Sequence, residues 1–191
     1  MEICGRYRAN IGSAPIWHER FGLIWLDIAA KKIITYDPAT NEERVYDALG
    51  WLQALIPTTD EQFIGVYKDG LYYLNFKLGT KKPFTTPSTI SDIYHLNNGK
   101  CSPNGDIWVG TSDSFYKKFK ETPQTAFSSY PFTNCRLFSI TAEGDMYTRL
   151  ENISLSTGVE WNREFNKIYH IDAPKHSIFQ YDDLNSTKYW L

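Results

Sequence analysis

One histidine and one carboxylate lie close enough in the sequence to suggest acid–base chemistry. His95 follows Asp92 by three residues. A histidine oriented by a neighbouring carboxylate is a common general base, because its ordinary pKa lies near physiological pH. Such neighbours are also frequent in loops that have no catalytic role, and a partly buried loop histidine is the favoured interpretation. His95 is therefore a candidate, and no catalytic residue is assigned.

The other reactive side chains have structural explanations. Cys101 follows a lysine, which could make its thiol reactive, but a small buried apolar role is favoured. Glu160 directly precedes Trp161, so we expect it on the surface of a strand unit. Asp27 and Asp172 recur at equivalent places in the chain, which favours a structural role in a turn over a unique metal ligand.

A stretch near the N-terminus returns near the C-terminus. Residues 11–37 and 155–182 share aromatic and acidic positions that are 144 or 145 residues apart. The equivalent pairs are Trp17 and Trp161, Phe21 and Phe165, Asp27 and Asp172, Tyr36 and Tyr181, and Asp37 and Asp182. The separation is three times about 48 residues, and the blades of a β-propeller recur every ~40–50 residues. The repeat therefore predicts propeller blades.

The elements that must position these residues are short strands. Runs rich in Ile, Trp, Tyr and Thr are bounded by Gly, Pro, Asp and Asn, which is typical of strands and turns. Blade units begin near residues 11, 52, 98 and 155, residues 68–70 predict a tight hairpin, and residues 2–9 predict a further strand. Four tryptophans are predicted to pack in the core: Trp17, Trp25, Trp108 and Trp161. The prediction is an all-β partial β-propeller of about four blades, a single domain over residues 1–191, with an excursion or lid at 112–134.

Composition excludes several classes of protein. The 20 basic and 22 acidic residues leave a net charge of −2 with no clustered basic face, so we expect no nucleic-acid partner. There is no apolar run long enough to span a membrane. Three cysteines, an odd number, and no visible leader favour a reduced cytoplasmic chain.

Several motifs, in order along the whole chain, resemble one family. They are Pro15-Ile16-Trp17, Trp25-Leu26-Asp27-Ile28, Tyr36-Asp37-Pro38, Asn97-Asn98-Gly99-Lys100, Pro103-Asn104-Gly105, Trp108-Val109-Gly110-Thr111 and Ser156-Thr157-Gly158-Val159-Glu160-Trp161. The chain resembles the senescence marker protein, gluconolactonase and regucalcin family, to which luciferin-regenerating enzyme is related. The resemblance implies a six-bladed propeller with one divalent cation, often calcium or zinc, on its central axis. It also implies hydrolysis of sugar lactones by a metal-activated water.

The resemblance also assigns site residues, and this chain departs from them. Ser13 stands where the family has a metal-binding Glu, and Thr157 stands where it has a metal-binding Asn. A third ligand, an Asp, belongs to a later blade that we expect to be missing. The family's substrate-binding Arg-x-Asn-Asp matches His95, Asn97 and Asn98, of which Asn97 alone is unchanged. Asp113 is a candidate replacement for a lid carboxylate of the family.

Two functions remain open on these residues. One is a lactone hydrolase of the family that uses a divalent cation. The other is a non-catalytic propeller fragment that serves as a binding module or is a decayed copy. Hydroxyl groups at Ser13 and Thr157 are poor ligands for a hard cation, whose affinity follows the number of charged oxygens, so impaired or absent catalysis is favoured. The expected partners are a small sugar lactone and, through open blade edges, a second copy of the chain, with no nucleic acid and no membrane.

Overall fold

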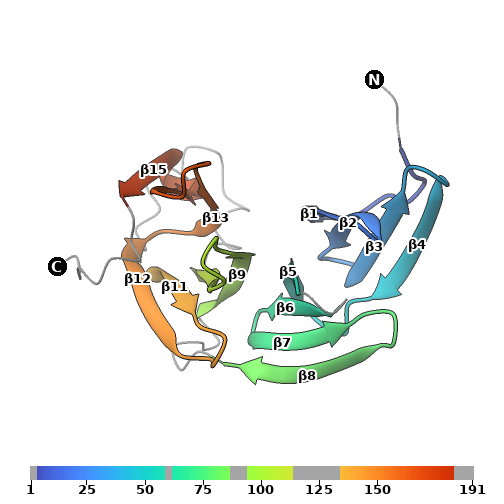
Figure 1. Cartoon of the computed structure of the whole chain (residues 1–191), viewed down its shortest axis with the longest axis horizontal. Helices are drawn as coiled ribbons and strands as arrows, with labels where there is room; N and C mark the ends of the chain where they lie inside the picture. The colour runs from blue at the N-terminus through green and yellow to red at the C-terminus, as the bar shows by residue number, and fades with distance from the viewer. Residues whose placement is uncertain (1–3, 59–61, 87–93, 114–133, 183–191) are drawn as a thin grey trace. The chain divides into compact units, whose positions relative to one another are not determined.

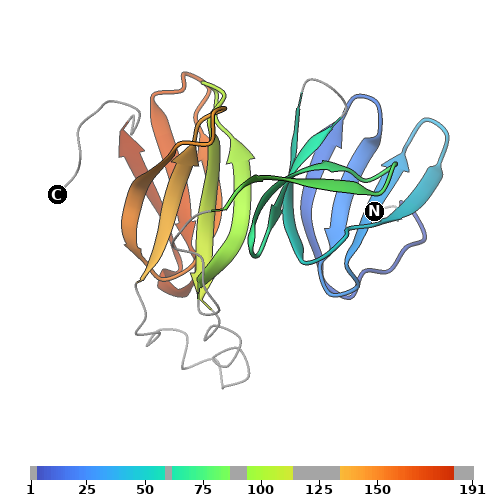
Figure 2. The same cartoon turned by 90° about the horizontal axis from the view of Figure 1, so that it is seen from below.

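The computed structural model describes residues 4–58, 62–86, 94–113 and 134–182. The chain divides into two compact units, Met1–Thr86 and Pro87–Leu191. Each unit contains two antiparallel sheets whose strands follow one another along the chain, as Figures 1 and 2 show. The sheets are called blades 1 to 4 in chain order. The all-β prediction of about four blades is confirmed.

Unit 1 contains blades 1 and 2, each a four-stranded meander. Blade 1 is formed by β1 (Gly12–His18), β2 (Gly22–Asp27), β3 (Lys32–Asp37) and β4 (Glu42–Asp47). Blade 2 is formed by β5 (Leu52–Pro57), β6 (Phe63–Tyr67), β7 (Gly70–Asn75) and β8 (Thr80–Thr85). The hairpin predicted at residues 68–70 joins β6 and β7, where Tyr67 pairs with Gly70.

Unit 2 contains blades 3 and 4. Blade 3 is formed by β9 (Tyr94–Cys101), β10 (Ile107–Asp113), β11 (Cys135–Ile140) and β12 (Met146–Ile153). Blade 4 has three strands, β13 (Ser156–Trp161), β14 (Lys167–Asp172) and β15 (Ser177–Asp182), with a short 3₁₀ turn η2 (Ala173–Lys175) before the last. The predicted excursion at 112–134 falls mostly on residues 114–133, outside the described residues.

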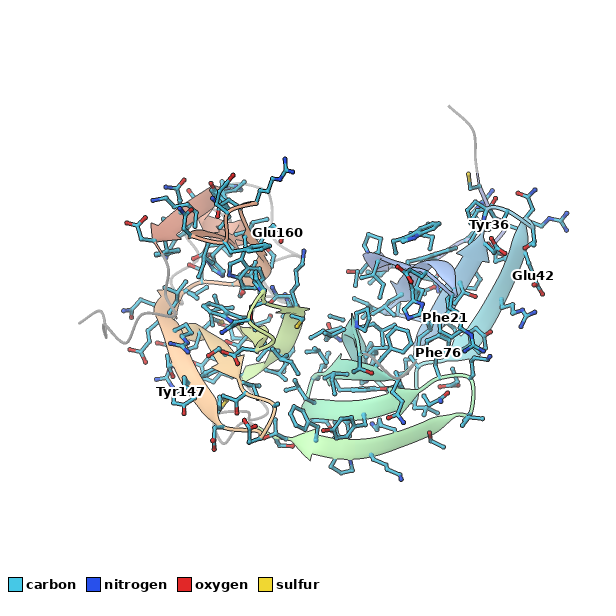
Figure 3. All side chains as sticks on the ribbon, viewed as in Figure 1. Phe21, Tyr36, Glu42, Phe76, Tyr147 and Glu160 are labelled. Carbon is cyan, nitrogen blue, oxygen red and sulfur yellow. The ribbon has the colours of Figure 1, made fainter. Side chains whose placement is uncertain are left out.

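The core of unit 1 lies between its two blades. Ile24, Leu26 and Ile33 of blade 1 pack against apolar side chains of blade 2 that include Leu52 and Phe63. At one end of this core the rings of Phe21 and Phe76 lie 5.3 Å apart between centroids (Figure 3). Neither blade could bury its apolar face alone, so the blades must stack.

The core of unit 2 contains two of the predicted tryptophans. Trp108 of blade 3 and Trp161 of blade 4 meet edge to face with centroids 5.6 Å apart, an arrangement that aromatic rings prefer. The prediction is wrong for Trp17, the counterpart of Trp161, which is 62 % exposed. Trp161 is buried by its contact with Trp108 of the preceding blade. Trp25 is half-buried.

Buried aspartates join the start of blades 1 and 4 to their second strands. Asp27 accepts hydrogen bonds from the backbone N–H of Asn10 and Ile11 at 2.8 and 3.2 Å. Asp172 accepts the equivalent bonds from Ser154 and Leu155 at 2.9 and 3.2 Å. The structural role predicted for these two residues is confirmed. Both are 1 % exposed, and each satisfies backbone donors that would otherwise be costly to bury.

The N-terminal segment binds to blade 1 without forming a strand. Residues 4–9, predicted to be part of a strand, lie outside every ladder, and residues 1–3 are outside the described residues. The backbone N–H groups of Arg6 and Tyr7 donate to the Glu43 carboxylate at 3.0 and 2.9 Å, and the Tyr7 hydroxyl donates to Asp27 at 3.1 Å. The Glu43 carboxylate thus accepts the backbone hydrogen bonds that a neighbouring strand would have accepted.

No helix among the described ranges is long and apolar enough to cross a bilayer. The cytoplasmic location, the single-domain organisation and self-association through open edges stay predictions.

Replacement of Asp27 by Asn tests the aspartate contacts. Burial alone would raise the pKa of this carboxyl, but hydrogen bonds from Asn10, Ala30, Ile11 and Tyr7 outweigh it and lower the pKa. An amide offers one acceptor oxygen and turns an NH₂ group toward those donors. We expect Asp27→Asn to lower the free energy of unfolding by about 2 kcal/mol, measured by urea denaturation. Asp37→Asn, at the end of β3, is the control and should cost less, because the hydrogen bonds to this carboxylate are exposed to solvent. Equal losses would contradict this role.

Candidate ligand site at the inner-strand bulges

The first strand of every blade carries one residue more than its neighbour. In β1, Ala14 and Pro15 stand opposite the single residue Trp25 of β2. The extra residue is Gln53 in β5, Asn97 in β9 and Thr157 in β13. Such bulges re-aim a side chain and are frequent beside functional sites. Two of these bulges coincide with positions that the sequence singled out, Asn97 and Thr157.

The structure brings Asn97 and the start of β13 together within unit 2. The Asn97 Nδ2 group donates to the Ser156 carbonyl oxygen at 2.7 Å, which links blade 3 to blade 4 next to the Thr157 bulge. Asn97 is half-buried and Thr157 is exposed. The Thr157 hydroxyl donates to the Ile171 carbonyl at 3.3 Å. One predicted substrate position and one predicted metal position are therefore neighbours.

A buried polar network lies behind these two residues. The Ser156 hydroxyl donates to Asn98 Oδ1 at 3.2 Å and lies 3.0 Å from His170 Nε2. The hydroxyl has one hydrogen, so when it donates to Asn98 the contact with His170 requires the tautomer that carries its proton on Nε2. Ser156 is fully buried and His170 is 1 % exposed. The backbone at Gly110 packs directly against Ser156 and Asn98.

The network is uncharged at neutral pH. Burial lowers the pKa of His170 to about 4, against an opposing effect of Asp172. Asn98 and Ser156 do not titrate in the ordinary range. The arrangement can hold the two bulges in place and offer amide and hydroxyl groups to a ligand. A proton relay at neutral pH would require His170 to accept a proton that its burial disfavours.

The remaining predicted residues lie at separate places. His95 is half-buried in β9 and pairs with Ser112, while its proposed partner Asp92 is outside the described residues. Asp113 is buried at the end of β10. Ser13 is half-buried in unit 1, where it pairs with Leu26 directly before the β1 bulge.

Two surface residues were also predicted. Glu160 is exposed and forms an ion pair with Lys100, as expected of a surface residue. The predicted burial of Cys101 is wrong, because the residue is exposed near the end of β9. Partial burial of its sulfur, together with Asp106, nevertheless raises the pKa of the thiol and leaves it a weaker nucleophile.

The donor set at the expected metal positions does not fit a hard cation. Ser13 and Thr157 offer neutral hydroxyls, and that of Thr157 is already directed at a backbone carbonyl. Calcium prefers six to eight oxygens, several of them from carboxylates. Within the described ranges, no group of three or more His, Cys, Asp or Glu side chains could hold a metal ion.

The sequence reasoning missed Gln53, Ser156 and His170. Gln53 is buried at its bulge, with its amide donating to the Trp51 carbonyl at 3.2 Å. A signal for His170 was present, because Ile168, His170 and Asp172 alternate along β14 on its buried face. Strand alternation places such residues inside, where a polar group needs a partner.

Comparison with known proteins gives a consistent match over most of the chain. Residues 11–189 match the family model described as SMP-30/Gluconolactonase/LRE-like region. The chain is 28 % identical over 175 residues to the putative sugar lactone lactonase YvrE of Bacillus subtilis, covering 91 % of this chain and 55 % of that protein. It is 21 % identical over 174 residues to human regucalcin, covering 90 % and 55 %.

Solved structures show the same fold. A luciferin-regenerating enzyme matches with a TM-score of 0.78 at 19 % identity, over 91 % of this chain and 56 % of that one. A calcium-binding regucalcin from Agrobacterium tumefaciens matches with a TM-score of 0.76 at 16 % identity, over 93 % and 56 %. The β-propeller class is thereby confirmed. The chain spans about half the length of the relatives that it matches.

Gly110 offers a test of the close packing in this site. A Cβ atom at this position would overlap the Ser156 hydroxyl and Asn98 Oδ1, neither of which is at the free end of a long side chain. We expect Gly110→Ala to lower the free energy of unfolding by about 1–3 kcal/mol, measured by chemical denaturation. Gly12→Ala, where a Cβ meets only ordinary contacts, is the matched control. Equal stability of the two variants would contradict the close packing of Gly110 against Ser156 and Asn98.

His170 predicts a specific dependence of stability on pH. The unfolded chain takes up this proton near pH 6.5 and the folded protein only near pH 4, so acidification between these values favours unfolding. The free energy of unfolding should fall by up to roughly 3 kcal/mol across that window and level off below it. Denaturation curves at a series of pH values measure this. His170→Gln removes the titrating group and should flatten the curve between pH 6.5 and 4; an unchanged slope would show that another group is responsible.

Proposed function

This chain belongs to the SMP-30/gluconolactonase/LRE-like family, and from that premise we propose that it binds sugar lactones or the aldonic acids derived from them. The binding site is the pair of bulges at Asn97 and Thr157 in unit 2. Metal-dependent hydrolysis of the bound lactone is weak or lost. The physiological role is accordingly that of a binding module more than that of an efficient lactonase.

The observation that carries this proposal is the hydrogen bond from Asn97 to Ser156. It fixes the one family substrate position that is unchanged here against the strand that begins the next blade. Within the described ranges, one N–H of the Asn97 amide is engaged, which leaves a second N–H and Oδ1 for a ligand. A sugar lactone or aldonate presents hydroxyl and carbonyl groups that match a neutral donor and acceptor of this kind.

The proposed loss of hydrolysis follows from the donor chemistry. A divalent cation such as calcium or zinc supplies family members with a water activated as a nucleophile. Ser13 and Thr157 replace the ligands that the resemblance assigns to that cation, and neither carries a charge. Asp92, the carboxylate expected beside the other candidate base His95, lies outside the described residues.

A second candidate function is retained lactone hydrolysis. It is favoured by the similarity to a protein named as a putative sugar lactone lactonase and by the unchanged Asn97. The two functions differ in whether added metal changes the rate of ring opening.

Binding and hydrolysis can be measured separately on the whole chain. We expect calorimetric titration with D-gluconate, which undergoes no ring opening, to show binding, and Asn97→Ala to weaken it about tenfold through loss of the amide. Asn166→Ala, at an exposed turn between β13 and β14, is the control and should bind as the wild type does. In a pH-stat assay, D-glucono-δ-lactone should open no faster with calcium, zinc or manganese than without.

The outcomes separate the two functions. A metal-dependent rate that Thr157→Ala abolishes would establish the lactonase and overturn the proposed loss of hydrolysis. Failure of the wild-type chain to bind either gluconate or the lactone would overturn the binding function itself.

A further inference from the structure

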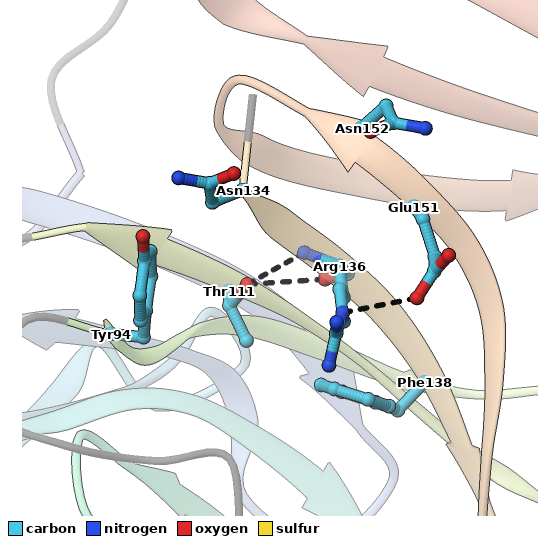
Figure 4. Close-up of a pocket in the computed structure, with 7 residues that line it drawn as sticks. All are labelled: Tyr94, Thr111, Asn134, Arg136, Phe138, Glu151 and Asn152. Carbon is cyan, nitrogen blue, oxygen red and sulfur yellow. Dashed lines mark hydrogen bonds and ion pairs between the residues drawn. The ribbon is translucent and has the colours of Figure 1, made fainter. Parts of the chain in front are cut away.

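A polar pocket lies in unit 2, at one end of blade 3. Its volume is about 410 Å³. All four strands of the blade contribute to it: Tyr94 begins β9, Thr111 lies near the end of β10, Arg136 near the start of β11 and Glu151 near the end of β12. Asn134, Phe138 and Asn152 complete the lining (Figure 4). The pocket shares no residue with the site at Asn97 and Thr157.

The charged groups of the pocket are held in place by the sheet. Arg136 Nε lies 3.2 Å from Glu151 Oε1. The backbone N–H of Arg136 donates to the Thr111 hydroxyl at 2.8 Å, and that hydroxyl donates to the Arg136 carbonyl at 3.3 Å. Figure 4 shows Arg136 between Thr111 and Glu151. The guanidinium and the carboxylate are therefore presented together from neighbouring strands.

Two side-chain amides add to this polar lining. Asn152 adopts a left-handed backbone conformation with φ of 58°, and its carbonyl accepts a hydrogen bond from Lys175 at 3.0 Å. Neither the Asn134 nor the Asn152 side-chain amide has a hydrogen-bond partner within the described ranges. Asparagine is among the non-glycine residues that adopt this conformation most readily.

The chemistry of the lining selects a class of ligand. Arg136 and Glu151 compensate each other's charge, so a neutral ligand needs no counter-charge. The guanidinium donates, the carboxylate accepts, and each amide does both, which matches hydroxyl groups that also donate and accept. Tyr94, which is half-buried, adds aromatic surface of the kind that packs against the apolar face of a sugar ring, and the buried Phe138 lies beneath the polar groups. The volume falls within the ~300–1,000 Å³ range of small-molecule pockets.

We propose that this pocket is a second binding site, and that it takes a neutral polyhydroxylated molecule of monosaccharide size. Glu151 and Arg136 bind adjacent hydroxyl groups, and Asn134 and Asn152 bind those farther along the ring. The inference does not depend on lactone binding at Asn97, because it stands on other residues.

The test uses the whole chain and D-glucose as the probe, with saturation-transfer NMR to detect binding and calorimetry to measure affinity. Glu151→Gln keeps the shape of the side chain and removes its charge and half of its acceptor capacity. We expect it to weaken glucose binding about tenfold, since hydrogen bonds to charged groups are the stronger ones. Asp182→Asn removes a comparable exposed carboxylate from the ion pair with Lys167, and it should leave the affinity unchanged.

Three controls keep the proposal falsifiable. Thermal unfolding shows whether Glu151→Gln is folded, and Asn134→Ala replaces it if it is not. Loss of glucose binding in Asn97→Ala would place glucose in the first site and overturn the second. The proposal also fails if the wild type does not bind glucose, if Glu151→Gln binds it unchanged, or if D-gluconate competes for this pocket more strongly than glucose does.

Discussion

In each blade the pairing of the first two strands shifts by one residue, and the candidate site depends on this shift. The first strand always has an extra residue opposite its neighbour, and the ladder absorbs it as a bulge near the start of the strand. Because side chains alternate between the two faces of a strand, the extra residue changes which face the preceding residues present. A polar side chain such as that of Asn97 or Thr157 can then lie in the first strand of a blade, while the residues after it still alternate between buried and exposed positions. The candidate ligand site exists because this irregularity is repeated, and the regular strands serve to hold it.

The parts of the fold that could be predicted are those that depend on the residue types of short sequence segments. Short β-branched and aromatic runs between turn residues located the strands, and Asp69-Gly70 located a hairpin. The recurrence of Asp27 as Asp172 predicted a structural role, because a ligand to a single axial ion would have no reason to recur. The structure shows why the aspartate recurs: each copy accepts hydrogen bonds from two backbone N–H groups of the segment that enters its blade. Because the same backbone N–H groups need an acceptor in both blades, the same residue type recurs in the sequence.

The errors fell where the environment of a residue is decided by a neighbouring blade. Trp17 and Trp161 occupy equivalent positions, yet Trp17 is 62 % exposed and Trp161 is 8 % exposed, because Trp161 packs against Trp108 of blade 3. Repeat periodicity identifies equivalent positions and carries no information about what packs against each of them. Bulges are equally hard to see, because a one-residue shift in register leaves the composition of the strand unchanged. The roles of Ser156 and His170 depend on that register and on contacts across two blades.

The side chains around Ser156 in the candidate site, Asn98 and His170, are uncharged at neutral pH. The resemblance to the family expects an aspartate at position 98, where this chain has Asn98. An aspartate beside the buried Ser156 would favour protonation of His170, since a buried charge needs a partner. With an amide at that position the hydroxyl has a neutral acceptor, and burial lowers the pKa of His170 to about 4, which keeps it neutral at neutral pH. The resemblance assigns charged side chains to positions 13 and 98, where this chain has Ser13 and Asn98. These neutral side chains are the basis of the proposed binding of hydroxyl and carbonyl groups without an activated water.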